Sequence, residues 1–389
     1  MAFCKQLTFR RSRIVICLVC FLLCIQVLNL ALFHRMDSKK TNSRTGTDLL
    51  RNILETISSK TVMDTSGLYQ IVKDVISRNR SVSLKQKLTI VTHCSADDLH
   101  YIIDLTRHWK GEVSISIFAL DGKLANLVRN LVNIFYCYNM VNVNFHIVFP
   151  LPTRTVILTD VDEFFPNCTL PVRLERTSRY SKLLYPTNLL RNVALSSVSS
   201  EFFLMIDDST LPNSDLYSHF RSEIDKGFLS KTAYILPSFE GDKNLNVPTS
   251  KAELNRHWLA GRVRPYGVRK CWDWEKPTDY QKWRTANKSY EVNWQSMWRP
   301  SFIARKSETP RFDERFFQYG FNRISQVCEM YVAGFRFIVH SKLFLIRRGF
   351  TSSNSLTNME KVQYKRNERL YRLFKEELQK RYRQSNRRC

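Results

Sequence analysis

The sequence predicts an α/β fold in which a mostly parallel central sheet is flanked by helices. Strand-like and helix-like segments alternate along the chain from about residue 88, which is typical of parallel strands joined by helices. Five apolar residues at 202–206 form a run too short for a helix and typical of a fully buried strand. Asp207 and Asp208 follow directly, at the carboxyl end of the strand, where open α/β sheets bind ligands.

The first half of the globular part contains four predicted strands. Apolar residues alternate with polar ones at 113–120, and the other apolar runs are short enough for strands. A helix begins near Pro186, because proline suits the first turn of a helix. The strands are expected at 88–93, 113–120, 143–148 and 202–206, and the helices between them at 97–109, 123–137 and 186–198.

The same pattern resumes in the second half after a strand at 233–239. We expect further strands at 301–305, 335–339 and 343–346, with a helix at 322–333. Residues 361–388 combine eleven Lys and Arg residues with an apolar stripe at helical spacing, formed by Tyr371, Phe374, Leu378 and Tyr382. This pattern predicts an amphipathic terminal helix that packs its stripe on the core.

The N-terminal part predicts a membrane anchor followed by a stem. Residues 14–33 contain no charged side chain, and about 20 such residues span a bilayer. A cleaved signal peptide is the alternative, but its apolar core usually has about 7–15 residues. We therefore expect a cytoplasmic tail at 1–13, a transmembrane signal anchor at 14–33, a stem at 34–85 with short helices at 48–56 and 68–77, and a lumenal domain at 86–389.

Glycosylation sequons and cysteines agree with a lumenal domain. Asn79, Asn167 and Asn287 each stand in an Asn-x-Ser/Thr sequence, the acceptor for glycosylation in the secretory pathway. Six cysteines follow the predicted anchor, enough for up to three disulfides in an oxidising compartment. Their spacing does not resemble that of a structural zinc site. They are Cys94, Cys137, Cys168, Cys271, Cys328 and Cys389.

The charge and the tryptophans indicate what the domain binds. The formal net charge is +25 at pH 7. A lumenal chain does not meet nucleic acid, so acidic glycans, nucleotide sugars and anionic surfaces are the expected partners of this field. Six of the seven tryptophans lie between Trp258 and Trp298. They are interpreted either as the lining of a sugar-acceptor groove or as an aromatic core.

The carboxylate pair at 207–208 has two interpretations of its own. Hard divalent cations prefer oxygen ligands, so Asp207 and Asp208 suit a cation that carries a diphosphate. Arg191, on the preceding helix, could face the same pocket. The alternative is a strand end with two solvated acids in a turn that Pro212 closes.

Three sequence blocks resemble an inverting glycosyltransferase family, the one that contains β-1,4-glucuronyltransferase and the second catalytic domain of LARGE. The resemblance covers about residues 86–389. The long third block has no gaps, which makes the resemblance specific. The blocks include Tyr185-Pro-Thr-Asn-Leu-Leu-Arg with Ile206-Asp-Asp-Ser-Thr-Leu-Pro, then Pro277-Thr-Asp-Tyr-Gln-Lys-Trp, and Phe312-Asp-Glu-Arg-Phe-Phe-Gln-Tyr-Gly-Phe-Asn-Arg.

The resemblance implies a GT-A nucleotide-diphospho-sugar transferase fold and a single-pass type II protein of the Golgi membrane. It implies the transfer of glucuronic acid from UDP-glucuronate to a xylose-ended glycan, such as that of α-dystroglycan. The expected partners are a UDP-sugar donor, a glycan or glycoprotein acceptor and the Golgi membrane. The sequence leaves open whether the chain forms a homo-oligomer or a hetero-oligomer with another glycosyltransferase.

Family members hold manganese (Mn2+) with an Asp-x-Asp motif and a downstream histidine, and this sequence departs from both. The first motif residue matches Asp207, the second falls on Ser209, and Asp208 stands between them. Asp207 and Asp208 are therefore the candidate metal ligands. The histidine position falls on Arg347. A guanidinium has no lone pair for a cation, but it pairs with phosphate oxygens in bidentate fashion.

Two accounts of the site follow from these departures. In the first, the enzyme is active with weak or no metal dependence, and arginines supply the positive charge. In the second, the fold is catalytically impaired and serves as a glycan-binding or partner protein. The candidates for binding the donor are Asn188, Arg191, Asp207 and Arg347.

An inverting transfer also needs a general base that takes the proton of the acceptor hydroxyl. Asp313 and Glu314 are the candidates, because they stand together in the third block. The alternative for this pair is structural: an internal ion pair with Arg315 or Arg311.

Overall fold

The structure is a computed structural model that describes most of the globular part of the chain. The described residues are 23–30, 46–77, 87–120, 123–151, 164, 166, 168, 185–207, 209–225, 227–267, 274–351 and 356–389. Of the predicted anchor, only residues 23–30 fall within these ranges, and they are helical. Within the described ranges, no helix has both the length and the apolar character needed to cross a bilayer.

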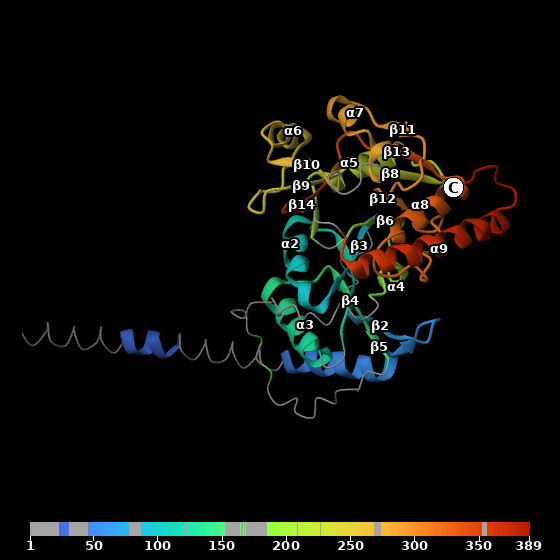
Figure 1. The fold of residues 1–389 in the computed structure, drawn as a ribbon. Coiled ribbons are helices and arrows are strands. Elements are labelled where there is room, and N and C mark those ends of the chain that lie inside the picture. Colours follow the sequence, from blue (N-terminus) through green and yellow to red (C-terminus); the bar gives the residue numbers. More distant parts are fainter. Residues whose placement is uncertain are drawn as a thin grey trace, which may run out of the picture.

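A ten-stranded sheet forms the centre of the molecule (Figure 1). Its strand order is β1-β2-β5-β4-β3-β6-β12-β8-β13-β11. The bounds are β1 Val62–Met63, β2 Tyr69–Ile76, β3 Leu88–Ser95, β4 Glu112–Phe118, β5 Val143–Pro150, β6 Phe202–Met205, β8 Thr232–Leu236, β11 Tyr290–Val292, β12 Ser301–Arg305 and β13 Arg336–Val339.

The central strands of this sheet are parallel, as predicted. β5 pairs with β4, β4 with β3 and β3 with β6, each in parallel. Every residue of β4 and β6 is buried. β6 is wholly apolar, as expected of a strand buried on both faces, whereas β4 also buries Glu112, Ser114 and Ser116. Antiparallel strands on both sides make the whole sheet mixed, since β12 runs against β6 and β8, and β2 runs against β5. The α/β class is confirmed.

A second, smaller sheet has four strands, and its strand β9 closely follows β8 of the large sheet along the chain. Its order is β10-β9-β14-β7. The predicted strand at 233–239 divides between the sheets, because Pro237 lies between β8 and β9 and lacks the N–H that a continuous ladder needs. The bounds are β7 Thr210–Pro212, β9 Ser238–Gly241, β10 Val263–Pro265 and β14 Leu345–Arg348.

The helices pack around the sheets near their predicted positions. α4 contacts β3, β4 and β5 and carries the segment that begins after Pro186. The bounds are η2 Ala96–Asp98, α2 His100–His108, α3 Leu124–Tyr138, α4 Thr187–Ser196, α5 Leu216–Asp225, α6 Lys251–Leu259, η5 Lys276–Thr278, α7 Tyr280–Thr285, α8 Asn322–Val332 and α9 Asn358–Arg381.

The terminal helix α9 packs against α8 as the amphipathic pattern predicted (Figure 1). Tyr371, Phe374 and Leu378 are buried in a cluster that also contains residues of α8. A capping box joins Thr357 to Glu360 and fixes the start of the helix. The helix ends at Arg381, earlier than the predicted 388, and the remaining residues form a C-terminal strap.

The folded domain begins before the predicted boundary at residue 86. The predicted helix at 68–77 is wrong: this segment is β2, which pairs with β5 in the main sheet. The predicted helix at 48–56 lies within a helix at residues 46–60. Its Leu50, Ile53 and Ile57 are buried in the main core. The segment from residue 46 to 77 is therefore part of the domain and not of a separate stem.

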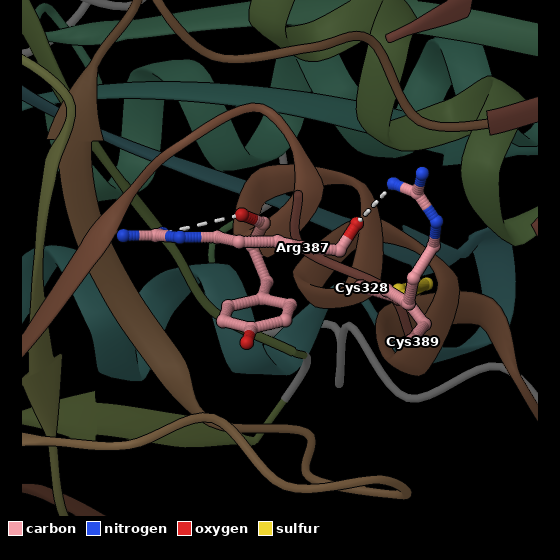
Figure 2. The surroundings of a disulfide bond; sticks show 5 residues. Cys328, Arg387 and Cys389 are labelled. Carbon is pink, nitrogen blue, oxygen red and sulfur yellow. Dashed lines mark hydrogen bonds between the residues drawn. A yellow bond between two sulfur atoms is a disulfide. The ribbon is translucent and has the colours of Figure 1, made fainter. Parts of the chain in front are cut away.

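Two disulfides join the cysteines of the described residues. One links Cys137 to Cys168, and the other links Cys328 in α8 to the C-terminal Cys389. Figure 2 shows the second bond beside Arg387. Arg387 donates to the Phe335 carbonyl oxygen at 2.6 Å, so the strap is held by a covalent and a polar contact. Cys94 is buried in β3.

Candidate functional site

A cavity of about 270 Å³ lies at the carboxyl ends of β3 and β6. Residues of both sheets line it: His93 and Ser301 come from the large sheet, and Thr210 and Arg347 come from the small one. Helix α4, the loop before α8 and segments that carry Tyr266, Glu275 and Arg299 add to the wall. This is the end of the parallel strands where α/β proteins bind ligands, so it is the candidate functional site.

Asp207 stands directly after β6 and is held by two arginines. Its Oδ1 accepts a hydrogen bond from Arg191 at 2.8 Å and one from Arg323 at 2.7 Å. Arg323 also donates to the Ser301 hydroxyl at 3.0 Å. The backbone then turns at Ser209, whose φ of 60° lies in the left-handed region. Asp207 is therefore the centre of a fixed three-residue ion cluster.

The charges of this cluster set the protonation of its members. Burial alone would raise the pKa of Asp207, but the charges of Arg323 and Arg191 outweigh burial and hold its pKa well below the usual range. Burial also lowers the pKa of Arg191, and the Asp207 charge opposes this effect. Asp207 is consequently ionised at neutral pH, and its Oδ1 accepts from both guanidiniums.

Asn188 supports the cluster without lining the cavity. Its Oδ1 accepts from Arg191 at 3.1 Å, and its Nδ2 donates to the Asp313 backbone oxygen at 2.8 Å. The side chain is fully buried. The predicted donor-binding residues Arg191, Asp207 and Arg347 thus share one cavity, whereas Asn188 orients Arg191 from behind.

The two predicted bases, Asp313 and Glu314, make ion pairs instead of lining the cavity. Asp313 is bound in bidentate fashion by Arg315, at 2.6 and 3.0 Å. Glu314 accepts from the Asn192 amide at 2.7 Å and from Arg311 at 3.1 Å. The structural alternative weighed for this pair therefore matches the geometry, and neither side chain is placed to accept a proton from a molecule in the cavity.

Arg347 and Arg299 add two further positive charges to the cavity wall. Arg347 lies beside Thr210 in the pairing of β14 with β7, and it donates to the Tyr266 hydroxyl at 3.2 Å. The Arg299 guanidinium stacks on the Trp274 ring, 3.7 Å from its centroid. All of these side chains line the cavity, so a bound anion meets guanidiniums next to flat aromatic surfaces.

Glu275 is the second carboxylate of the cavity wall. Its Oε2 accepts from the Tyr280 hydroxyl at 3.1 Å. Burial raises the pKa of Glu275 to about 7, although the charges of Arg299 and Arg323 and the Tyr280 hydrogen bond oppose the rise. Unlike Asp207, this carboxyl group exchanges a proton near neutral pH.

His93 is a neutral group of the cavity wall. Its Nδ1 lies 2.9 Å from the Tyr185 hydroxyl. Burial, assisted by the Arg191 charge, lowers the pKa of His93 to about 3. An imidazole with that pKa stays uncharged at neutral pH and adds no charge to the site.

The charge of the described cavity wall is positive. Arginines outnumber carboxylates in it, and one carboxylate, Asp207, already neutralises part of two guanidiniums. A bound polyanion therefore meets positive charge that the carboxylates of the wall do not fully neutralise. The arginines are Arg191, Arg299, Arg323 and Arg347, and the carboxylates are Asp207 and Glu275.

The described residues do not fit a manganese ion. No group of three or more His, Cys, Asp or Glu side chains comes together among them in a way that could hold a metal. Asp207 directs its Oδ1 to two guanidiniums, and Arg347 occupies the expected histidine position with a side chain that only donates. Asp208, the other candidate ligand, lies outside the described residues.

The tryptophans divide between the two interpretations given above. Trp274 lines the cavity, as the groove interpretation requires. Trp283 and Trp298 are fully buried, as in an aromatic core. The core interpretation therefore holds for these two.

Of the three sequons, one lies within the described residues. Asn287 is exposed after α7, so its side chain is accessible to modification. Asn79 and Asn167 lie outside the described residues.

Comparison with known proteins places the chain in a family. Residues 87–383 match the family described as glycosyl-transferase for dystroglycan. The chain belongs to this family. It is 32% identical over 364 residues to beta-1,4-glucuronyltransferase 1 of Danio rerio, covering 86% of this chain and 84% of the relative. The human protein of that name is 31% identical over 361 residues, with the same coverage.

More distant matches cover less of the other protein. Human "Xylosyl- and glucuronyltransferase LARGE1" is 27% identical over 273 residues, which are 69% of this chain and 32% of that protein. Among solved structures, GalNAc-T7 with UDP, GalNAc and Mn2+ gives a TM-score of 0.40 at 11% identity, covering 72% of this chain and 48% of that one. This overlap carries no argument. The predicted glycosyltransferase family is confirmed by the sequence matches, and the predicted GT-A α/β fold agrees with it.

Several residues of the site were not predicted from the sequence. Arg323 lies in the third resembling block, and that resemblance was the available signal for it, whereas Tyr266 directly follows β10. Arg299 and Glu275 stand in a tryptophan-rich stretch that gave no sign of a charged site. Only the fold brings them to the wall shared with Asp207.

Proposed function

We propose that this chain is an inverting β-1,4-glucuronyltransferase that moves glucuronic acid from UDP-glucuronate to a xylose-ended glycan, such as that of α-dystroglycan. The observation that carries the proposal is the arginine-rich cavity at the carboxyl ends of β3 and β6 in a member of the dystroglycan glycosyltransferase family. Relatives at 31–32% identity over 84% of their length have the name beta-1,4-glucuronyltransferase 1.

The chemistry of the donor matches the charge of the wall. UDP-glucuronate carries a diphosphate and a sugar carboxylate, and guanidiniums pair with both kinds of anion. Arg347 and Arg299 line the same cavity as the Asp207 cluster and lie next to aromatic rings. In this arrangement they stabilise the negative charge that develops on the departing UDP. Manganese is not required for this role, which agrees with the poor fit of the described residues to a metal.

The Golgi location remains part of the proposal. The uncharged run at 14–33 supports a single-pass type II anchor with tail, stem and lumenal domain in that order. The two disulfides support an oxidising compartment. The exposed Asn287 sequon agrees with exposure to the glycosylation machinery.

A second candidate function is favoured by the same departures from the family motif. Because Arg347 replaces the metal-binding histidine and the described residues do not fit a metal, the chain could be a catalytically impaired member that binds glycans or a partner glycosyltransferase. This alternative predicts salt-sensitive binding of acidic glycans without sugar transfer.

A transfer assay separates the two functions. The full-length chain in detergent is incubated with UDP-glucuronate and a β-xyloside, once with manganese and once with a chelator. Product under both conditions supports the arginine account, and product only with manganese supports Asp207 and Asp208 as ligands. Absence of product and of UDP binding under both conditions contradicts the proposed enzyme and leaves the binding protein.

A further inference from the structure

An inverting transfer needs a general base that takes a proton from the acceptor hydroxyl. The two carboxylates predicted for this role are both held by other side chains. Asp313 is committed to Arg315, and Glu314 is committed to Asn192 and Arg311. Neither lines the cavity. Among the described residues, the other side chains of the cavity wall are the remaining candidates for the base.

The described cavity wall offers few groups that can accept a proton at neutral pH. Asp207 is a very weak base, because two guanidiniums hold its pKa well below the usual range. His93 is also weak, because burial lowers its pKa to about 3 and its Nδ1 lies against the Tyr185 hydroxyl. Glu275 is the remaining carboxylate of the wall.

The hydrogen bonds around Glu275 fit both of its protonation states. The Tyr280 hydroxyl lies 2.9 Å from the Ser238 carbonyl oxygen and 3.1 Å from Glu275 Oε2, and the Ser238 N–H donates to it at 3.2 Å. A hydroxyl has one proton and two lone pairs. When Glu275 is ionised, Tyr280 donates to it; when Glu275 is protonated, it donates to Tyr280, which then donates to Ser238.

We propose that Glu275 is the general base that takes the proton from the acceptor hydroxyl. The inference rests on the proposed function, because it needs a glycosyl acceptor in this cavity. The step balances as follows: the acceptor O–H bond breaks and its proton moves to a Glu275 oxygen, while the freed oxygen forms a bond to the anomeric carbon of glucuronic acid. The bond from that carbon to the diphosphate breaks, and UDP leaves with the electron pair.

The electrostatic surroundings of Glu275 suit this role. Burial raises its pKa to about 7, while the charges of Arg299 and Arg323 and the Tyr280 hydrogen bond limit the rise. A general base is most effective when its pKa lies near the working pH. Arg299 is also one of the two arginines that stabilise UDP as it leaves, so the base and the leaving-group contacts belong to one cavity.

The test is a Glu275→Gln variant compared with Glu329→Gln. Glu329 is a matched control: it is buried, burial raises its pKa, and it accepts from a tyrosine, Tyr382, at 3.0 Å. It lies in α8 and does not line the cavity. The readouts are kcat, UDP affinity and the pH profile of kcat for the full-length chain.

We expect Glu275→Gln to lower kcat by about 10²–10⁴-fold, the usual contribution of a general base. UDP affinity should stay unchanged, and the control variant should keep its kcat. For the wild type, kcat should rise with pH through about 7, the pKa of Glu275, and this rise should be lost in Glu275→Gln. Tyr280→Phe removes a hydrogen bond that favours the ionised form, so it should move the rise to higher pH.

Two results would overturn the inference. If Glu275→Gln keeps the kcat and pH profile of Glu329→Gln, another group takes the proton. If Glu275→Asp, which retains a carboxylate, also loses the pH-dependent rise, the carboxylate is not its source. Failure of the wild type to bind UDP or transfer sugar would contradict the proposed function itself, and the inference with it.

Discussion

Replacing Asp207 by Asn tests whether the central ion cluster exists in solution. The substitution keeps the shape of the side chain but removes the charge that neutralises Arg191 and Arg323. These guanidinium side chains are only 5% and 11% exposed, whereas the Asp207 side chain is 41% exposed. The variant therefore leaves two largely buried cations without their anion.

The size of the effect follows from the contacts that are lost. Hydrogen bonds to charged groups contribute about 1.5–3 kcal/mol each, and removing one partner of a buried pair costs about 3–5 kcal/mol. Solvent screening of the partly exposed carboxylate reduces these values. We therefore expect Asp207→Asn to lower the free energy of unfolding by about 2–4 kcal/mol.

Urea unfolding of Asp207→Asn beside Asp242→Asn measures this difference. Asp242 is a matched control, because its side chain is 42% exposed and it bonds Arg262 at 3.1 Å, but that arginine is 49% exposed. Its loss should cost less than about 1 kcal/mol. Equal losses for the two variants would refute the reasoning, since Asp207 would then not be held by buried arginines and would be free to bind a metal.

Three further predictions follow. Arg347→Ala should weaken UDP binding by about 10–100-fold in calorimetry, the loss of one charge-assisted contact, whereas Arg262→Ala outside the cavity should not; equal affinities would contradict a donor role. Because burial raises the pKa of Glu275 from 4.5 to about 7, the folded state retains a proton that the unfolded state releases. The free energy of unfolding should then fall between these pH values by roughly 3 kcal/mol at most, and Glu275→Gln should abolish that slope in urea titrations at about pH 5 and 8. Cys389→Ser opens the 61-residue link to Cys328 (Figure 2) and should lower the midpoint of thermal unfolding, with a loss of about 2–4 kcal/mol; an unchanged midpoint would show that the strap does not constrain the fold.

Much of the fold could be predicted from the sequence because its signals are local. The buried run at 202–206, the alternating strand at 113–120 and the apolar stripe of α9 each depend on hydrophobic period alone. The segment at 68–77 was misassigned because it is short and its neighbours in the sheet are distant in sequence: β2 pairs with β5. Pairing with a strand distant in sequence, and not the local sequence pattern, makes this segment a strand.

The site could be predicted only where the chemistry lies next to a recognisable strand end. Asp207 and Arg191 were found in this way, and they do meet at 2.8 Å. Asp313 and Glu314 were predicted as general bases because of their residue type, but each forms an ion pair with a nearby arginine. Glu275 could not be found, because its environment depends on Tyr280 and on arginines that the fold brings close from separate segments.

The central claim is that guanidiniums of the cavity hold the donor diphosphate without a metal ion. Isothermal calorimetry of UDP with the full-length chain, in a chelator and then in manganese, tests this claim most directly. The account predicts the same affinity under both conditions. Binding that appears only when manganese is present would contradict it.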